Sequence, residues 1–135
     1  MSVEFLRWVA YAEENLAVAR MALEGGHFNA ALQNIQQAVE KFLKSSLLAL
    51  RRPCPRTHSI ETLNDRLREA GKEMSLSDED CAFLDAIYIP SKYPVGSALP
   101  DFDPTAEIVL RGICIAESVH RATCHIVKPG DGRMR

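Results

Sequence analysis

The sequence lacks several features that would assign it at once to a common class of protein. No stretch approaches the roughly 18 uninterrupted apolar residues that a membrane-spanning helix needs, and the first residues lack the basic region and apolar run of a secretory signal. The four cysteines show neither a C-x-x-C pair nor the spacing of a zinc knuckle. We therefore expect a cytoplasmic protein with ordinary thiols and without a cofactor.

Motifs of self-sufficient enzymes are also missing. No nucleophile elbow surrounds any serine, and Gly25-Gly26 is too short for a phosphate-binding loop and lacks the Lys-Ser or Lys-Thr that would follow one. Sixteen basic and eighteen acidic residues give a formal net charge of -2, which disfavours a broad nucleic-acid footprint but allows a local basic patch. These absences favour a binding protein over an enzyme, with no catalytic residue assigned.

What the sequence does contain is apolar residues at helical spacing along nearly its whole length. They recur every three or four positions over residues 3–24 and 28–50, and Gly25-Gly26 separates the two stretches. The short linker predicts an antiparallel helical hairpin. A shorter helix is expected from a cap at Thr57 or Ser59 to Gly71.

Two more helices complete the pattern. Ser77 and the acidic residues after it predict a helix that Pro90 closes, and Asp103 followed by Pro104 predicts the N-cap of a last helix that ends near residue 127. Residues 89–102 hold three prolines and one glycine and are expected to form a long loop. We predict an all-α fold, an up-and-down bundle of four to five helices over residues 1–128, with a frayed tail at 129–135.

One face of the second helix is polar. It carries these residues at helical spacing: Gln33, Gln36, Gln37, Glu40, Lys41 and Lys44. Alone, the pattern is typical of a solvated surface with an i,i+4 ion pair between Glu40 and Lys44. The alternative is a binding site, to which Arg56 and His58 before the third helix, and Lys92 and Tyr93 in the loop, would add phosphate donors and a stacking ring.

Three stretches resemble the HEPN domain family (higher eukaryotes and prokaryotes nucleotide-binding). Residues 31–44 are similar to the family's Gln-Gln-Ala-x-Glu-Lys-x-x-Lys helix. Thr57-His58 resembles the start of its third helix, and Tyr88 with Lys92-Tyr93-Pro94 resembles its tyrosine followed by an Arg-Tyr-Pro loop. Order and spacing agree over about residues 3–127.

The resemblance implies a helical bundle, frequent homodimers, nucleotide or RNA binding, and partnership with a minimal nucleotidyltransferase in a toxin-antitoxin pair. Carried over by position, it implies these ligand-binding residues: Gln37, Glu40, Lys41, Lys44, His58, Tyr88, Lys92 and Tyr93.

The chain departs from the family's ribonucleases, whose Arg-x4-6-His motif lies near the last helices. Residues 97–99, where that histidine would fall, are Ser-Ala-Leu. Arg52 and His58 match the spacing but lie between the second and third helices, and we interpret the match as coincidental. Two alternatives stay open beside non-catalytic binding: a metal-independent ribonuclease toxin that uses Arg52, His58 or another basic pair, and a plain dimerisation module.

A metal site is not predicted. His120 and Cys124 stand four residues apart on the last helix, with His125 beside them, but two ligands on one helix do not make a four-ligand zinc site.

Overall fold

The computed structural model describes residues 4–92 and 104–127, without the side chains of residues 89–92. Within these ranges the chain forms only helices: α1 (Glu4–Glu24), α2 (Phe28–Ala49), α3 (Ile60–Glu69), α4 (Asp78–Lys92) and α5 (Ala106–Val127). The all-α prediction is confirmed. None of the helices in the described part is long and apolar enough to cross a membrane.

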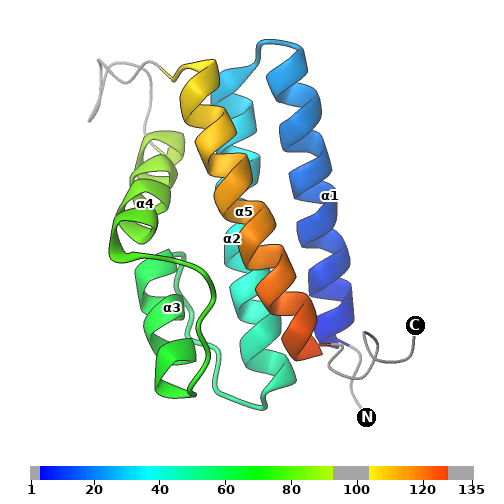
Figure 1. Ribbon diagram of the computed structural model, residues 1–135, viewed down its shortest axis with the longest axis vertical. Helices are drawn as coiled ribbons and strands as arrows, with labels where there is room; N and C mark the ends of the chain where they lie inside the picture. The colour runs from blue at the N-terminus through cyan, green and yellow to red at the C-terminus, as the bar shows by residue number, and fades with distance from the viewer. Residues whose placement is uncertain (1–3, 93–103, 128–135) are drawn as a thin grey trace.

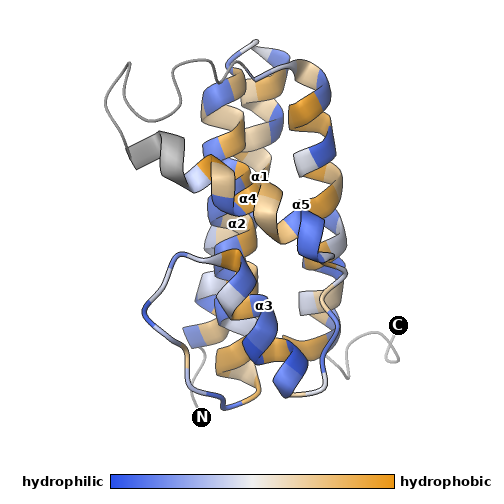
Figure 2. Cartoon of the chain, turned by 90° about the vertical axis from the view of Figure 1, so that its left-hand side faces the viewer, coloured by the Kyte–Doolittle hydropathy of each residue, from blue (hydrophilic) through white to orange (hydrophobic). Residues whose placement is uncertain are grey.

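The bundle is organised around α2. The three long helices α1, α2 and α5 lie side by side (Figure 1). The shorter helices α3 and α4 lie one below the other, on the side of the bundle away from α1. Helix α2 contacts all four other helices. Helix α3 is mostly hydrophilic (Figure 2) and buries one narrow face, formed by Ile60, Leu63, Asn64 and Leu67. Because α3 and α4 pack against α2, part of the polar face of α2 is shielded from solvent.

Helix α1 ends as its glycines predict. Gly26 adopts a positive φ of 78°. The backbone N–H of Gly26 donates to the carbonyl of Leu23 at 3.1 Å, and that of His27 donates to the carbonyl of Ala22 at 2.8 Å. This pair of bonds is a Schellman motif, in which glycine accepts the left-handed conformation without a Cβ clash. The reversal turns the chain directly into α2, so the expected hairpin is confirmed.

Two of the expected N-terminal caps are confirmed. Ser59 Oγ accepts a hydrogen bond from the backbone N–H of Thr62 at 3.1 Å. Ser77 Oγ accepts from the N–H of Asp80 at 3.0 Å, and Asp80 Oδ2 accepts from the N–H of Ser77 at 3.2 Å. The second arrangement is a reciprocal capping box, which satisfies N–H groups that the first turn of α4 cannot pair internally.

The expected start of the last helix is wrong. Helix α5 begins at Ala106, and Thr105 Oγ1 accepts a hydrogen bond from the N–H of Ile108 at 3.2 Å. Thr105 is therefore the cap, whereas Asp103 lies outside the described residues. Threonine and aspartate both serve as N-caps, so the residue types alone did not decide between them.

The expected end of the fourth helix is also wrong. Helix α4 runs two residues beyond Pro90, to Lys92. Proline fixes φ near a helical value and removes only its own N–H bond, so a helix can continue through it at a cost in stability. Residues 89–92 of the predicted loop therefore belong to α4, and its remainder lies outside the described residues.

Candidate functional site

A cavity of about 480 Å³ lies beside the polar face of α2. Its lining consists of Trp8, Gln33, Gln36, Gln37, Glu40, Lys41, Lys44, His58, Ile87 and Tyr88. The fold thus brings together six of the eight predicted binding residues, from α2, the segment before α3, and α4. The other two predicted residues cannot be placed relative to the cavity, because the side chain of Lys92 and the whole of Tyr93 lie outside the described residues.

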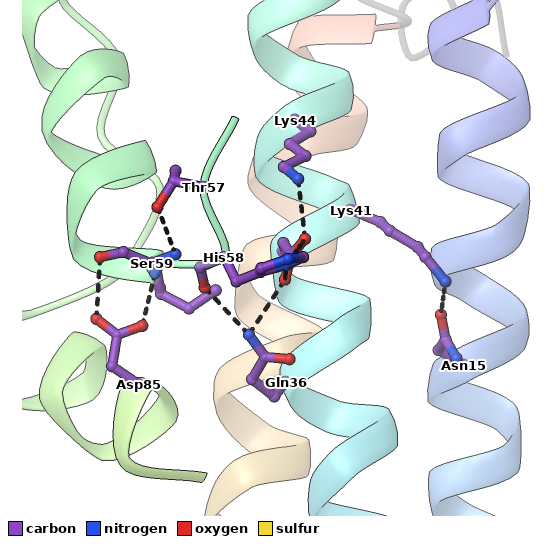
Figure 3. Close-up of polar contacts among 10 residues, drawn as sticks. Asn15, Gln36, Lys41, Lys44, Thr57, His58, Ser59 and Asp85 are labelled. Atoms are coloured by element: carbon purple, nitrogen blue, oxygen red, sulfur yellow. Dashed lines mark hydrogen bonds and ion pairs between the residues drawn. The ribbon is translucent and has the colours of Figure 1, made fainter. Parts of the chain in front are cut away.

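Glu40 is the centre of the polar contacts in the cavity wall. Its Oε2 accepts from Lys44 Nζ at 2.9 Å, and its Oε1 accepts from Gln36 Nε2 at 3.3 Å. The Nδ1 atom of His58 lies 3.1 Å from Oε2 and 3.3 Å from Oε1. Figure 3 shows the side chains of Gln36, Lys44 and His58 converging from α2 and from the segment before α3. The Glu40 carboxylate therefore contacts Gln36, Lys44 and His58 at once.

The central part of this polar face is not a solvated surface. Gln36 is only 2% exposed, and the side chains of Glu40 and Lys44 are 11% and 13% exposed. Gln37, by contrast, is exposed. The interpretation of the face as an ordinary solvated helix surface is wrong for Gln36, Glu40 and Lys44, whose side chains are only slightly exposed. Burying an ion pair costs desolvation energy, which additional hydrogen bonds such as those to Glu40 must offset.

His58 is held from three directions. Its Nδ1 faces Glu40, its backbone carbonyl accepts from Gln36 Nε2 at 3.3 Å, and its ring stacks on Tyr88 with centroids 4.8 Å apart and planes 19° apart. The arrangement fixes the ring orientation and directs Nδ1 toward the carboxylate. The sequence left the role of His58 open, and the structure places it in the cavity wall.

Asp85 of α4 fixes the segment that carries His58. Its Oδ1 accepts from the N–H of Ile60 at 2.6 Å, and its Oδ2 accepts from the N–H of Glu61 at 3.2 Å and from Ser59 Oγ at 3.3 Å. With the Ser59 cap, the first three N–H groups of α3 are thereby paired. No sequence pattern indicated this contact, since aspartate within a helix is ordinarily a surface residue.

Lys41 occupies the α1 side of the cavity. Its Nζ donates to Asn15 Oδ1 at 2.6 Å, and Asn15 Nδ2 donates to Asn34 Oδ1 at 2.9 Å. Lys44 Nζ also lies 6.0 Å from the ring centroid of Trp8. Trp8 and Asn15 were missed because they lie on α1, outside the motif; the single tryptophan of the chain was the only available signal. The cavity thus offers two ammonium groups and the aromatic rings of Trp8 and Tyr88.

Two basic residues considered from the sequence do not line this cavity. Arg56 lines a second cavity, which shares His58 and Tyr88 with the first, and Arg52 is exposed and lines neither. The convergence expected for Arg56 near the polar face of α2 therefore stays a prediction, whereas that of His58 is confirmed by its contact with Glu40.

Two of the four cysteines, Cys54 and Cys81, have thiols with a raised pKa. Burial raises the pKa of Cys54, beside the cavity residues, with a smaller lowering by Lys44 and a smaller raising by Glu40. Burial also raises the pKa of Cys81 to about 11, and the negative charge of Asp85 adds to the shift. The reactive form of cysteine is the thiolate, so a raised pKa disfavours nucleophilic chemistry at both residues.

Comparison with known proteins agrees with this architecture. TT1696 from Thermus thermophilus, known from a crystal structure, superimposes with a TM-score of 0.71 and 25% identity over 90% of this chain and 97% of its own. ST0689, described as an archaeal HEPN homologue, is 22% identical over 97% of this chain and 98% of its own, with a TM-score of 0.46. No protein of curated function matches the chain by sequence. The model of the HEPN domain matches residues 5–127, and the chain belongs to the HEPN domain family.

Proposed function

We propose that the cavity beside α2 binds a phosphate-bearing ligand, a nucleotide or a segment of RNA, without cleaving it. The observation that carries this proposal is the environment of Lys41. Its ammonium group lines the cavity and, among the residues that the structure describes, donates to the neutral amide oxygen of Asn15 instead of to a carboxylate. An amide leaves the positive charge of the lysine unbalanced, and phosphate would balance it.

The rest of the cavity fits the same ligand class. Glu40 balances the charge of Lys44 and also holds Gln36 and His58 in place, so it acts as an organiser of the wall. Trp8 and Tyr88 offer ring faces on which a base could stack. A cavity of about 480 Å³ is within the range of small-molecule sites.

The proposal predicts that Lys41→Ala weakens ligand binding at least about tenfold, because one charge-assisted phosphate contact is worth on the order of 1.5 kcal/mol or more. Isothermal titration calorimetry against ATP, GTP and a short single-stranded RNA measures the effect. Lys72→Ala is the matched control, since Lys72 is exposed and lines a different cavity. Binding by the control should equal that of the wild type.

Two results would count against a non-catalytic phosphate site. If the wild-type protein binds none of the three ligands, or if Lys41→Ala binds as well as Lys72→Ala, the cavity is not a phosphate site. If the RNA is cut in the presence of a chelator and His58→Ala prevents the cut, the protein is a metal-independent ribonuclease. The contact between His58 Nδ1 and Glu40 is the observation that favours this second function, because a carboxylate orients a histidine for proton transfer.

We further propose that the protein acts in the cytoplasm as a homodimer, alongside a minimal nucleotidyltransferase in a toxin-antitoxin pair. Large apolar side chains on the outer surface of α1 support an interface with another chain. Tyr11 and Val18 are exposed two turns apart on one face of that helix, and Met21 is exposed one turn further on.

Replacing Tyr11 and Val18 together by lysine should shift the protein from dimer to monomer, because charges in an apolar interface lose their hydration when it closes. Analytical ultracentrifugation measures the mass. The double variant Ala10→Lys and Ala17→Lys adds the same charge at neighbouring exposed positions of α1 and should change the mass less. A wild-type protein that sediments as a monomer at all concentrations contradicts the homodimer.

A further inference from the structure

A second cluster of polar side chains joins α1 and α5, and none of its members lines the cavity described above. It consists of Glu13 on α1 and of His120 and Cys124 on α5. We propose that these three residues form a Zn²⁺ site with an open fourth position. The proposal does not depend on the proposed function of the cavity beside α2.

The geometry of the cluster is the first argument. One ligand atom from each residue lies within 4.8 Å of the others, and His120 Nε2 is 2.8 Å from Glu13 Oε2. The ring of His120 stacks on Phe42 of the central helix, with centroids 4.8 Å apart and planes 17° apart. This stack fixes the direction of Nε2. Cys124 follows His120 by four residues, so both side chains project from the same face of α5.

The chemistry of the ligands selects the metal. Thiolate and imidazole together favour zinc over magnesium and calcium, which prefer oxygen ligands. One thiolate and one carboxylate would balance the two positive charges of the ion. Three protein ligands leave a fourth position, as in zinc sites that also bind water or an external group.

Only small movements are needed to admit the ion. Zinc lies roughly 2.0–2.3 Å from its ligands in a tetrahedral site, so the nitrogen and oxygen atoms of the pair would separate by about 0.5 Å. The sulfur of Cys124, within 4.8 Å of the other ligand atoms, would approach them by up to about 1 Å. The side chain of Glu13 is 45% exposed, so its carboxylate has room to move while the ring of His120 stays stacked on Phe42. The nearby Glu117 already pairs with Arg20 at 2.6 Å and is not required as a ligand.

Cobalt titration of the reduced protein tests the proposal. Co²⁺ replaces zinc in such sites, and its bond to a thiolate produces a charge-transfer absorption in the near ultraviolet. We expect one Co²⁺ per chain, this absorption in the wild type, and its loss when Zn²⁺ is added. Cys124→Ser should abolish the absorption and weaken binding at least tenfold, and Glu13→Gln should also weaken binding. Zn²⁺ should raise the melting temperature of the wild type but not of Cys124→Ser, because the ion binds the folded state.

Two matched controls come from the same helix. Cys114 is an exposed cysteine of α5. His125 is next to Cys124 in the sequence but is not part of the cluster, and it lines the cavity that also contains Lys72. Cys114→Ser and His125→Ala should bind Co²⁺ like the wild type, with the same absorption. The proposal is overturned if the wild type shows no thiolate absorption with Co²⁺, or if the absorption survives in Cys124→Ser.

Discussion

Replacing Glu40 with alanine is expected to lower the free energy of unfolding by about 3 kcal/mol, since the loss of one partner leaves buried polar groups unpaired. The carboxylate is 11% exposed and bonds to Lys44, Gln36 and His58. Without it, the Lys44 ammonium remains largely buried with no counter-charge, and the Gln36 amide loses an acceptor. Urea denaturation followed by circular dichroism measures the change.

A double-mutant comparison tests whether the loss comes from the buried pair. Because Glu40→Ala leaves an uncompensated ammonium, Lys44→Ala added to it should recover part of the lost stability. Glu61→Ala on α3 is the matched control, since it removes an exposed carboxylate and should change stability by less than about 0.5 kcal/mol. If Glu40→Ala costs no more than this control, the network around Glu40 does not stabilise the bundle.

The fold was largely predictable from the sequence because its signals are local. Apolar spacing, the glycines after α1 and the serine caps each act within a few residues of one helix, and the caps at Ser59 and Ser77 are confirmed. The errors occurred where two local signals competed. Pro90 can end a helix or continue it, and Thr105 lies close to Asp103, another acceptable cap.

The candidate site was only partly predictable, because its remaining contacts join distant parts of the chain. The motif on α2 identified Glu40, Lys41 and Lys44, but nothing in it indicated that α3 and α4 would bury this face. Asn15 contacts Lys41, which is 26 residues away in the sequence, and Glu13 contacts His120, which is 107 residues away. Helical periodicity describes which face of one helix is apolar, and it does not say which polar residue of another helix lies opposite.

Asp85→Ala is expected to lower the free energy of unfolding by about 2 kcal/mol, the upper end of the range for losing a helix cap. Asp85 accepts from the N–H groups of Ile60 and Glu61, which lie at the start of α3 and have no partner within the helix. The effect should extend to the cavity, because the same contact anchors the segment that holds His58 against Tyr88.

Chemical denaturation measures the stability loss, and the NMR signals of the His58 ring report the displacement, since the ring current of Tyr88 shifts them when the two rings stack. Asp65→Ala is the control, because Asp65 is an exposed aspartate on α3. Asp85→Asn should lie between the wild type and Asp85→Ala, since the amide keeps one oxygen acceptor but no charge to favour the positive end of the helix dipole. A variant Asp85→Ala with wild-type stability and unchanged His58 signals would mean that Ser59 alone is sufficient to start α3 and position the cavity wall.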